Sequence, residues 1–245
     1  MKKPIIIQGA MEIEVEYLIK QIENIKKVNI QGYEFYEGTM NNYPIVISKT
    51  NCGEIEMSVA TILGILKYNP IAIINQGTAG AHDLSLCQHD IVVGTSCINI
   101  NSFEAMAKEK GQGSNPLSWE LKTFKDGIDE LIEIPASEEL IELANKVKHK
   151  YTNGKVVFGI LGGGDGWNKE WDRIDWLNKN YHTLCEDMES IATYTICKKQ
   201  NIPVIGIRVI SNNERIKKQI YDKTIGLDSQ KFAIELCKEC IRSNK

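Results

Sequence analysis

Two kinds of hydrophobic pattern alternate along the chain of 245 residues. Short and nearly continuous apolar runs are typical of buried strands, and they occupy residues 4–8, 71–75, 91–95, 156–161, 183–186 and 204–210. Between them, apolar positions at helical spacing predict helices over residues 11–23, 54–67, 137–150, 171–180, 188–199 and 229–241. Two further β-rich runs, 32–37 and 43–49, flank Asn41-Asn42 and predict a hairpin.

This alternation of strands and helices predicts an α/β fold with a central, mixed and largely parallel sheet. Neither an internal repeat nor a linker divides the chain, so we expect a single domain over residues 1–245. Residues 98–120 are a long polar stretch that contains Gly111 and Gly113. Irregular segments of this length are commonly functional lids or disordered loops, and both interpretations stay open here.

The composition is that of an ordinary globular protein, with 42% hydrophobic and 25% charged residues, and it excludes disordered and collagen-like classes. The net charge of -3 offers no attraction for a nucleic acid. No apolar run approaches the ~18 residues of a membrane helix, and the N-terminal apolar stretch is too short for a signal peptide. We therefore expect a cytoplasmic protein that binds neither nucleic acid nor membrane.

The cysteines and basic residues indicate which kinds of disulfide, metal, redox or phosphate site the chain could form. Seven scattered cysteines, an odd number, do not suggest a disulfide framework. Cys237 and Cys240 have CxxC spacing but no second pair, which favours helix packing over a zinc or redox site, and the 4 histidines lack metal-ligand spacing. Only Arg173, Arg208 and two later residues are arginines, the side chains best suited to bidentate phosphate binding. A phosphate site built from several arginines is therefore not expected.

Residues that could take part in catalysis or ligand binding follow five of the predicted strands. Ligands of open α/β sheets bind beyond the carboxyl ends of the strands. The segments at these ends are rich in glycine, carboxylates and amides, and they are residues 9–14, 77–80, 163–167, 186–189 and 211–213. The second of these segments is expected to be a turn. The five ends predict one cleft that contains carboxylates, glycines and a large aromatic ring.

Four of these segments resemble motifs of one enzyme family. Residues 9–14 resemble the GAMxxE opening of 5′-methylthioadenosine/S-adenosylhomocysteine nucleosidases, and residues 75–80 resemble their NxGSAG turn. Residues 187–189 match the EMEA-type ribose-binding signature, and residues 208–212 match the RxISD segment. Order and spacing agree from residue 4 to about 240. The chain is thereby identified as a member of the purine nucleoside phosphorylase superfamily, which implies a three-layer α/β/α fold.

The resemblance implies a role for each matching residue. Glu14 falls on the glutamate that activates the attacking water, and Glu189 on the glutamate that binds the ribose hydroxyls. Met188 lines the ribose, Trp167 lies against the purine, and Asn212 contacts the base. The remaining positions that the resemblance assigns to substrate binding are Thr78, Ala79, Gly80, Asp187, Arg208 and Ser211.

The chemistry of N-ribosidic hydrolysis suits these side chains. The reaction passes through an oxocarbenium-like sugar and needs an activated water. A carboxylate such as Glu14 can act as the general base, typically for ~10²–10⁴-fold. The negative charge of Glu189 favours the cationic sugar, and the Trp167 indole offers an apolar platform for the base.

Two departures from the family pattern stand out, one at Ala81-His82 after the glycine turn and one at Asn212. The nucleosidases carry an aspartic acid where this chain has Asn212. A carboxylic acid can donate a proton to purine N7, whereas an amide can only hydrogen-bond N7 and a 6-oxo group. In the wider superfamily, asparagine at this position goes with 6-oxopurines such as inosine and guanosine. The resemblance therefore implies a nucleosidase for 6-oxopurines, with a 5′-methylthioadenosine/S-adenosylhomocysteine nucleosidase as the alternative.

The choice between water and phosphate as the nucleophile depends on charge. Phosphorylases of the superfamily hold phosphate with arginines, typically one soon after the first strand. Here no arginine precedes Arg173, and Glu14 occupies that neighbourhood. We therefore predict an N-glycosyl hydrolase without metal or organic cofactor, with a phosphorylase or a non-catalytic nucleoside-binding protein as alternatives. The resemblance also implies a homodimer in which the partner closes the 5′ side of the pocket.

Overall fold

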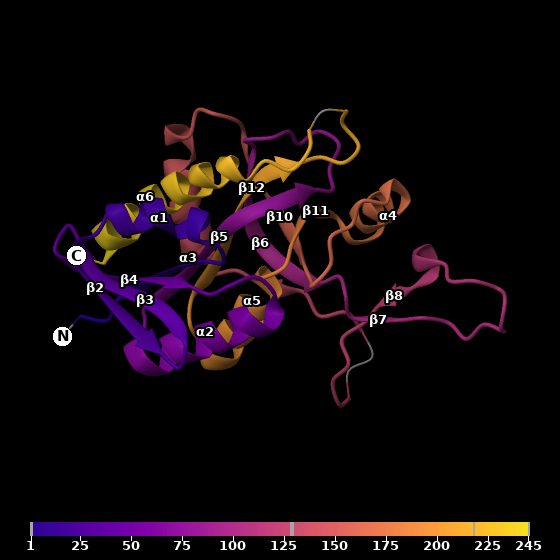
Figure 1. The fold of residues 1–245 in the computed structure, drawn as a ribbon, viewed down its shortest axis with the longest axis horizontal. Helices are drawn as coiled ribbons and strands as arrows, with labels where there is room; N and C mark the ends of the chain where they lie inside the picture. Colours follow the sequence, from indigo (N-terminus) through magenta and orange to yellow (C-terminus); the bar gives the residue numbers. More distant parts are fainter. Residues whose placement is uncertain (1, 128–129, 218, 245) are drawn as a thin grey trace.

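The computed structural model describes residues 2–127, 130–217 and 219–244. A ten-stranded sheet forms the middle of this structure (Figure 1). Its strands are β1 (Ile5–Gly9), β2 (Glu23–Ile30), β3 (Tyr33–Met40), β4 (Tyr43–Lys49), β5 (Ala72–Ala81), β6 (Ile91–Asn99), β9 (Ile134–Pro135), β10 (Val156–Gly163), β11 (Thr183–Asp187) and β12 (Val204–Asn212). A separate short pair consists of β7 (Phe103–Glu104) and β8 (Glu120–Leu121).

The strand order is β11-β10-β6-β12-β5-β1-β4-β3-β2, with β9 paired to β6. Strand β5 lies between β1 and β12 and is parallel to both. Strand β10 is likewise parallel to β6 and β11. The pairs β5–β11, β6–β12, β2–β3 and β3–β4 are antiparallel. The sheet is therefore mixed, and its parallel pairs bring several carboxyl ends to one edge.

Helices cover both faces of the sheet and complete the predicted three layers. They are α1 (Glu12–Lys20), α2 (Glu54–Tyr68), α3 (Glu138–Val147), α4 (Trp171–Tyr181), α5 (Ser190–Gln200) and α6 (Gly226–Ser243). Helices α1 and α3 both pack against α6, whereas α2 packs against α5 on the opposite face (Figure 1). Single 3₁₀ turns are η1 (Pro116–Ser118), η2 (Lys148–Lys150) and η3 (Lys223–Ile225). Within the described ranges, every helix is too short or too polar to cross a membrane.

The central strands form the hydrophobic core. Ile7 of β1 and Ile73 and Ile74 of β5 are completely buried. Burying such a side chain contributes about 1.5–3 kcal/mol, so these strands are a rigid support for the loops at their ends. Cys237 and Cys240 are buried in α6 as free thiols, which agrees with a packing role.

Two predictions of secondary structure from the sequence are wrong. The helix predicted over residues 11–23 ends at Lys20, and Glu23 begins the edge strand β2. This strand is largely exposed and carries Lys26 and Lys27, and such charged residues protect a sheet edge from pairing with another chain. An exposed, charged edge strand lacks the apolar pattern by which a strand is predicted. The turn predicted over residues 77–80 is also wrong, since β5 continues through it to Ala81.

Candidate active site

A cavity of about 220 Å³ lies at the edge of the sheet where β1, β5, β11 and β12 end. It is lined by Ala10, Met11, Glu14, Cys52, Thr78, Ala79, Gly80, Gly166, Trp167, Glu186, Asp187, Met188, Glu189, Ser211, Asn212 and Tyr221. Its walls come from segments far apart in the sequence, as the predicted convergence of strand ends requires. Every site residue named from the sequence lines this cavity except Arg208.

Glu14 is buried at the start of α1 and is fixed by four donors. Its Oε2 accepts hydrogen bonds from the backbone N–H groups of Ala10, at 3.0 Å, and Met11, at 3.2 Å. Its Oε1 accepts from the backbone N–H of Thr78 at 2.9 Å and from the Thr78 hydroxyl at 3.2 Å. A side chain on Gly77 would put its Cβ 3.0 Å from Oε1, so a glycine there leaves room for the carboxylate. The strand end and the helix start thus hold Glu14 together.

Glu189 lies just before α5 and receives a hydrogen bond from the backbone N–H of Gly53, at 3.1 Å. Burial, together with the nearby carboxylates of Asp187 and Glu14, raises the pKa of Glu189 to about 8. Arg208 lowers the pKa of Glu189, but by less than burial and the two carboxylates raise it. The cavity is therefore an environment that disfavours one more negative charge.

Asp187 and Arg208 form a buried ion pair beside the cavity. Arg208 Nε lies 3.1 Å from Asp187 Oδ2, and the two side chains are 1% and 0% exposed. Arg208 also donates to the side chain and backbone carbonyl of Asn75. Asp187 Oδ1 accepts from the backbone N–H groups of Glu189 and Ser190, which is the capping role that its position before a helix suggests. Arg208 thus supports the loop that carries Glu189 but does not itself line the cavity, and its role in substrate binding stays a prediction.

Asn212 is oriented by its neighbours. The Ser211 hydroxyl donates to Asn212 Oδ1 at 2.9 Å, and Asn212 Nδ2 donates to Glu214 Oε1 at 3.1 Å. These bonds fix which end of the amide is which, so Nδ2 keeps its second hydrogen for another acceptor. Nδ2 is also the atom nearest to the empty side-chain position of Gly80, at 3.4 Å. Asn212 therefore presents a donor toward this side of the cavity.

An aromatic pair lies at the mouth of the cavity. The Trp167 ring, on the loop after β10, is 53% exposed and meets the Tyr221 ring edge-on at a centroid distance of 5.4 Å. Lys169 Nζ lies 4.7 Å from the Trp167 centroid. The cavity thus has an apolar face suited to a flat ring.

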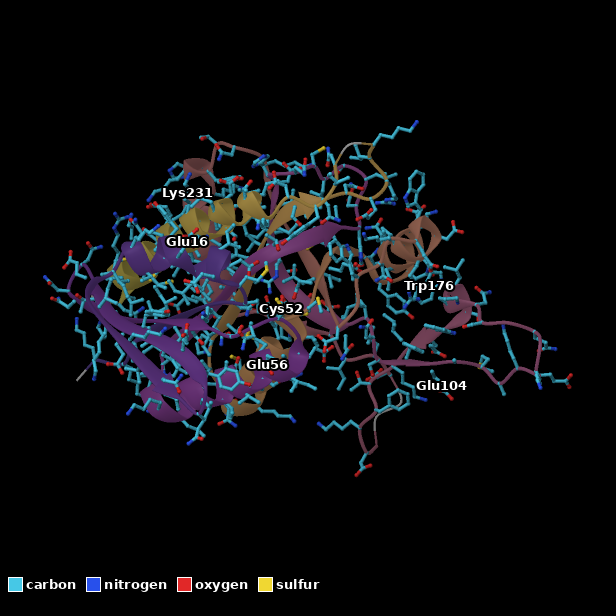
Figure 2. All side chains as sticks on the ribbon, viewed as in Figure 1. Glu16, Cys52, Glu56, Glu104, Trp176 and Lys231 are labelled. Carbon is cyan, nitrogen blue, oxygen red and sulfur yellow. The ribbon has the colours of Figure 1, made fainter. Side chains whose placement is uncertain are left out.

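Sequence reasoning missed Cys52 and Tyr221 as lining residues, and it placed Glu186 in the expected cleft without assigning it a role. Cys52, labelled in Figure 2, lies between β4 and α2, and Tyr221 lies in the segment before η3; neither belongs to the five segments expected to form the cleft. Glu186 directly precedes the motif at residues 187–189, so its place at a strand end was the available signal. Burial raises the pKa of the Cys52 thiol to about 11, with the carboxylates of Glu189 and Glu14 adding to the effect, so Cys52 stays a neutral thiol.

The charged side chains that line the cavity are acidic. Its carboxylates are Glu14, Glu186, Asp187 and Glu189, and among the described residues no lysine or arginine lines it. Nor does the described part of the chain contain a group of three or more His, Cys, Asp or Glu side chains arranged to hold a metal ion. The arrangement can bind a neutral, hydroxyl-rich or cationic molecule with a flat apolar portion.

Fold and cavity together define an α/β protein with an acidic, aromatic-rimmed site at the carboxyl edge of its sheet. The chain belongs to the phosphorylase superfamily, whose sequence model matches residues 4–242.

Curated relatives and solved structures agree with this family. A 5′-methylthioadenosine/S-adenosylhomocysteine nucleosidase of Psychromonas ingrahamii is 30% identical over 210 residues, and one of a Shewanella species is 32% identical over 211; each match covers 84% of both chains. The nucleosidase of Neisseria meningitidis, solved with methylthio-immucillin-A, has the same fold, with a TM-score of 0.80, 23% identity and coverage of 97% and 99%. The futalosine hydrolase of Helicobacter pylori also shares the fold, with a TM-score of 0.80, 20% identity and coverage of 97% and 98%.

The raised pKa of Glu189 predicts a pH-dependent cost to stability. The unfolded chain ionises this group near 4.5, whereas the folded chain keeps it protonated up to about pH 8. Relative to Glu189→Gln, which cannot ionise and still accepts from Gly53, the wild type should lose stability as pH rises from about 4.5 to 8, by on the order of a few kcal/mol. Denaturant unfolding at several pH values measures this difference.

Glu16→Gln is the control, because Glu16 is exposed on α1 (Figure 2). The free energy of unfolding of Glu16→Gln should show the same pH dependence as that of the wild type. If the free energies of unfolding of the wild type and Glu189→Gln changed with pH in parallel, the raised pKa of Glu189 would be contradicted.

Proposed function

We propose that this chain is a purine nucleosidase, which uses water to cleave the N-ribosidic bond of a purine nucleoside into a free base and a ribose moiety. One observation carries the proposal: four carboxylates line the cavity, and no lysine or arginine among the described residues does so. Phosphate would be repelled there, whereas an oxocarbenium-like sugar is attracted. The relatives named as nucleosidases support the same reaction class.

In this proposal Glu14 takes the proton of the attacking water. Three of its four donors are backbone N–H groups that cannot turn away, so the carboxylate keeps its position. The fourth donor, the Thr78 hydroxyl, can rotate and leave its acceptor site to a water molecule. A fixed base beside a replaceable donor is what general-base activation of water requires.

Glu189 binds the ribose hydroxyls, and Met188 lies against the ribose. Because the pKa of Glu189 is about 8 in the unliganded protein, the carboxyl group can donate as well as accept when it meets a sugar hydroxyl. Positive charge on the sugar stabilises the ionised form, so the attraction grows as the bond breaks. An interaction that strengthens toward the transition state accelerates the reaction itself.

The base occupies the aromatic end of the cavity. Trp167 offers the flat face, and Asn212 Nδ2 donates to N7 of the purine. As the bond breaks, the base leaves with the electron pair, and the hydrogen bond from Asn212 stabilises the developing negative charge. The base then takes up a proton from solvent, and Glu14 returns to solvent the proton that it took from water. Thr78, Ala79, Gly80 and Ser211 complete the walls.

Two classes of purine are candidates for the base. The curated relatives are named for 5′-methylthioadenosine and S-adenosylhomocysteine, so 5′-methylthioadenosine is the first substrate to test. Asn212 favours 6-oxopurines as a second candidate, because an amide can serve N7 and O6 without having to donate a proton. A purely binding protein is a weaker alternative, since it would not need a fixed base at Glu14.

Base release in phosphate-free buffer tests the reaction class. We expect free purine and a reducing sugar from at least one purine nucleoside, with no increase in rate when phosphate is added. Chromatography of the products and a reducing-sugar assay measure both. Turnover that requires phosphate and yields ribose 1-phosphate would show that the protein is a phosphorylase.

The role of Glu14 is tested by Glu14→Gln. Glutamine keeps the shape of the side chain but cannot take a proton from water, so kcat should fall by about 10²–10⁴-fold, with little change in the affinity for the free base. Steady-state kinetics and calorimetry measure the two quantities. Glu16→Gln, on the exposed side of the same helix, should retain full activity, and an unchanged kcat for Glu14→Gln would reject the role.

The protein is also proposed to be a homodimer formed through α2. Ile55 and Leu66 on this helix are each 74% exposed, while the helix packs against α5 on its other side. Light scattering after size exclusion should give twice the mass of the chain. The double variant Ile55→Asp/Leu66→Asp should be monomeric, whereas Leu84→Asp, at an exposed leucine away from α2, should leave the dimer intact. A monomeric wild type would refute the dimer.

A further inference from the structure

The first turn of α2 is capped by a side chain from a distant part of the sequence. Helix α2 begins at Glu54, and Gly53 before it has no side chain that could accept from the free N–H groups of this turn. Asp165, on the loop after β10, takes this role: its Oδ1 accepts from the backbone N–H of Glu54 at 2.8 Å. A carboxylate at a helix N-terminus is also favoured by the helix dipole. Asp165 thus fixes where α2 begins.

The contact between Asp165 and Glu54 is reciprocal. The backbone N–H of Asp165 donates to Glu54 Oε1 at 3.3 Å, so each of the two side chains holds the backbone of the other residue. The loop that carries Asp165 is itself anchored, since the backbone N–H of Gly164 donates to the backbone carbonyl of Asp187 at 3.0 Å. Asp165 therefore connects the start of α2 to the strand end that leads to Glu189.

Gly53 turns the same piece of backbone toward the cavity. Its φ of +101° lies in a region that residues with a side chain rarely adopt, and a Cβ there would lie 3.1 Å from Asp165 Oδ1. In this conformation the Gly53 N–H donates to Glu189 Oε1 at 3.1 Å. Two successive backbone N–H groups therefore meet two carboxyl groups, that of Glu189 on the cavity side and that of Asp165 outside the cavity lining.

Glu189 depends strongly on its hydrogen bond to Gly53. Four hydrogen bonds hold the carboxylate of Glu14, whereas within the described ranges the carboxyl group of Glu189 accepts from Gly53 alone. The terminal torsion of a glutamate is broad, so a single fixed donor decides how the carboxyl group is turned. The position of the Gly53 N–H therefore decides how Glu189 meets the ribose hydroxyls.

We propose that Asp165 is a positioning residue for Glu189. It holds the start of α2 so that the Gly53 N–H keeps the Glu189 carboxyl group in place for the ribose hydroxyls. The proposal rests on the proposed nucleosidase function and deepens it, because it names a residue outside the cavity lining on which binding of the sugar depends.

The test measures how much the ribose hydroxyls contribute to binding. Inosine and adenosine are each compared with the 2′,3′-dideoxy nucleoside, which lacks both hydroxyls, by calorimetry in the Glu14→Gln background, where turnover is slow. This parent should bind the ribonucleoside about 10- to 100-fold more tightly than the dideoxy compound, the range expected for a hydrogen bond to a charged group.

Asp165→Ala removes the acceptor of the Glu54 N–H. The ratio of the two dissociation constants should fall by about 10-fold, through weaker binding of the ribonucleoside alone. Asp165→Asn keeps a side-chain oxygen for the same N–H, so it should keep the ratio of the parent. In a Glu189→Ala protein, adding Asp165→Ala should cause no further change, because residues coupled through one network do not contribute additively.

The matched control is Asp172→Ala. Asp172 is an exposed aspartate in the first turn of α4, so it also lies at a helix start, and it does not line the cavity. Its ratio should equal that of the parent.

Glu54→Pro removes the same hydrogen bond from the donor side. Proline has no backbone N–H and fits the first position of a helix, which Glu54 occupies in α2. The ratio should fall as in Asp165→Ala, whereas Glu54→Gln, which keeps the N–H, should keep the ratio of the parent. If Asp165→Ala does not fold, Glu54→Pro decides.

The outcomes separate the role of Asp165 from the proposed reaction. An unchanged ratio in Asp165→Ala, or equal weakening for the ribonucleoside and the dideoxy compound, would overturn this role and leave the nucleosidase intact. If the wild type cleaves no nucleoside while Asp165→Ala lowers the ratio and Asp165→Asn keeps it, the nucleosidase is refuted and the role of Asp165 is supported. A parent that binds both compounds equally would refute the ribose contact of Glu189 and this role with it.

Discussion

One buried guanidinium supports the acidic cavity. Arg208 of β12 reaches Asn75 on β5 and Asp187 at the end of β11, so a single side chain ties three strands together at the edge where the site lies. Removing one member of such a pair leaves an uncompensated charge in a medium of low dielectric, which is far more costly than losing an exposed ion pair. Because Asp187 in turn holds the backbone of Glu189, the position of the Glu189 carboxyl group depends on this pair.

The same pair explains why a superfamily member can lack a phosphate site. Arg208 is the arginine nearest in sequence to the cavity motifs, yet its charge is directed at Asp187 and Asn75 and is fully buried. Of the carboxylates that line the cavity, Asp187 is therefore paired with Arg208, whereas Glu14 and Glu189 have no lysine or arginine beside them among the described lining residues. Burial and the neighbouring carboxylates of Asp187 and Glu14 raise the pKa of Glu189 to about 8, so the cavity would favour positive charge on a ligand.

The sequence predicted most of the central architecture because buried strands and amphipathic helices have distinct periods. It failed at β2, an edge strand whose lysines face solvent, and at residues 77–80, where small residues suggested a turn. There the glycines serve close approach instead: Gly77 faces the carboxylate of Glu14, and Gly80 faces Asn212. The convergence of Glu14, Glu189 and Asn212 on one cavity followed from motif order. Cys52 and Tyr221 could not be foreseen, since loop paths depend on tertiary packing.

The register around Gly80 has a consequence for how such proteins diverge. Glu186 and Asn212 flank this glycine on neighbouring strands, while Glu14 and Glu189 reach the cavity from a helix start and a loop. The flanking pair lies on strands whose backbone is fixed by neighbours on both sides. The strand pairing at this edge therefore does not depend on these two side chains, so exchanging either one would change the lining of the cavity and leave the scaffold in place.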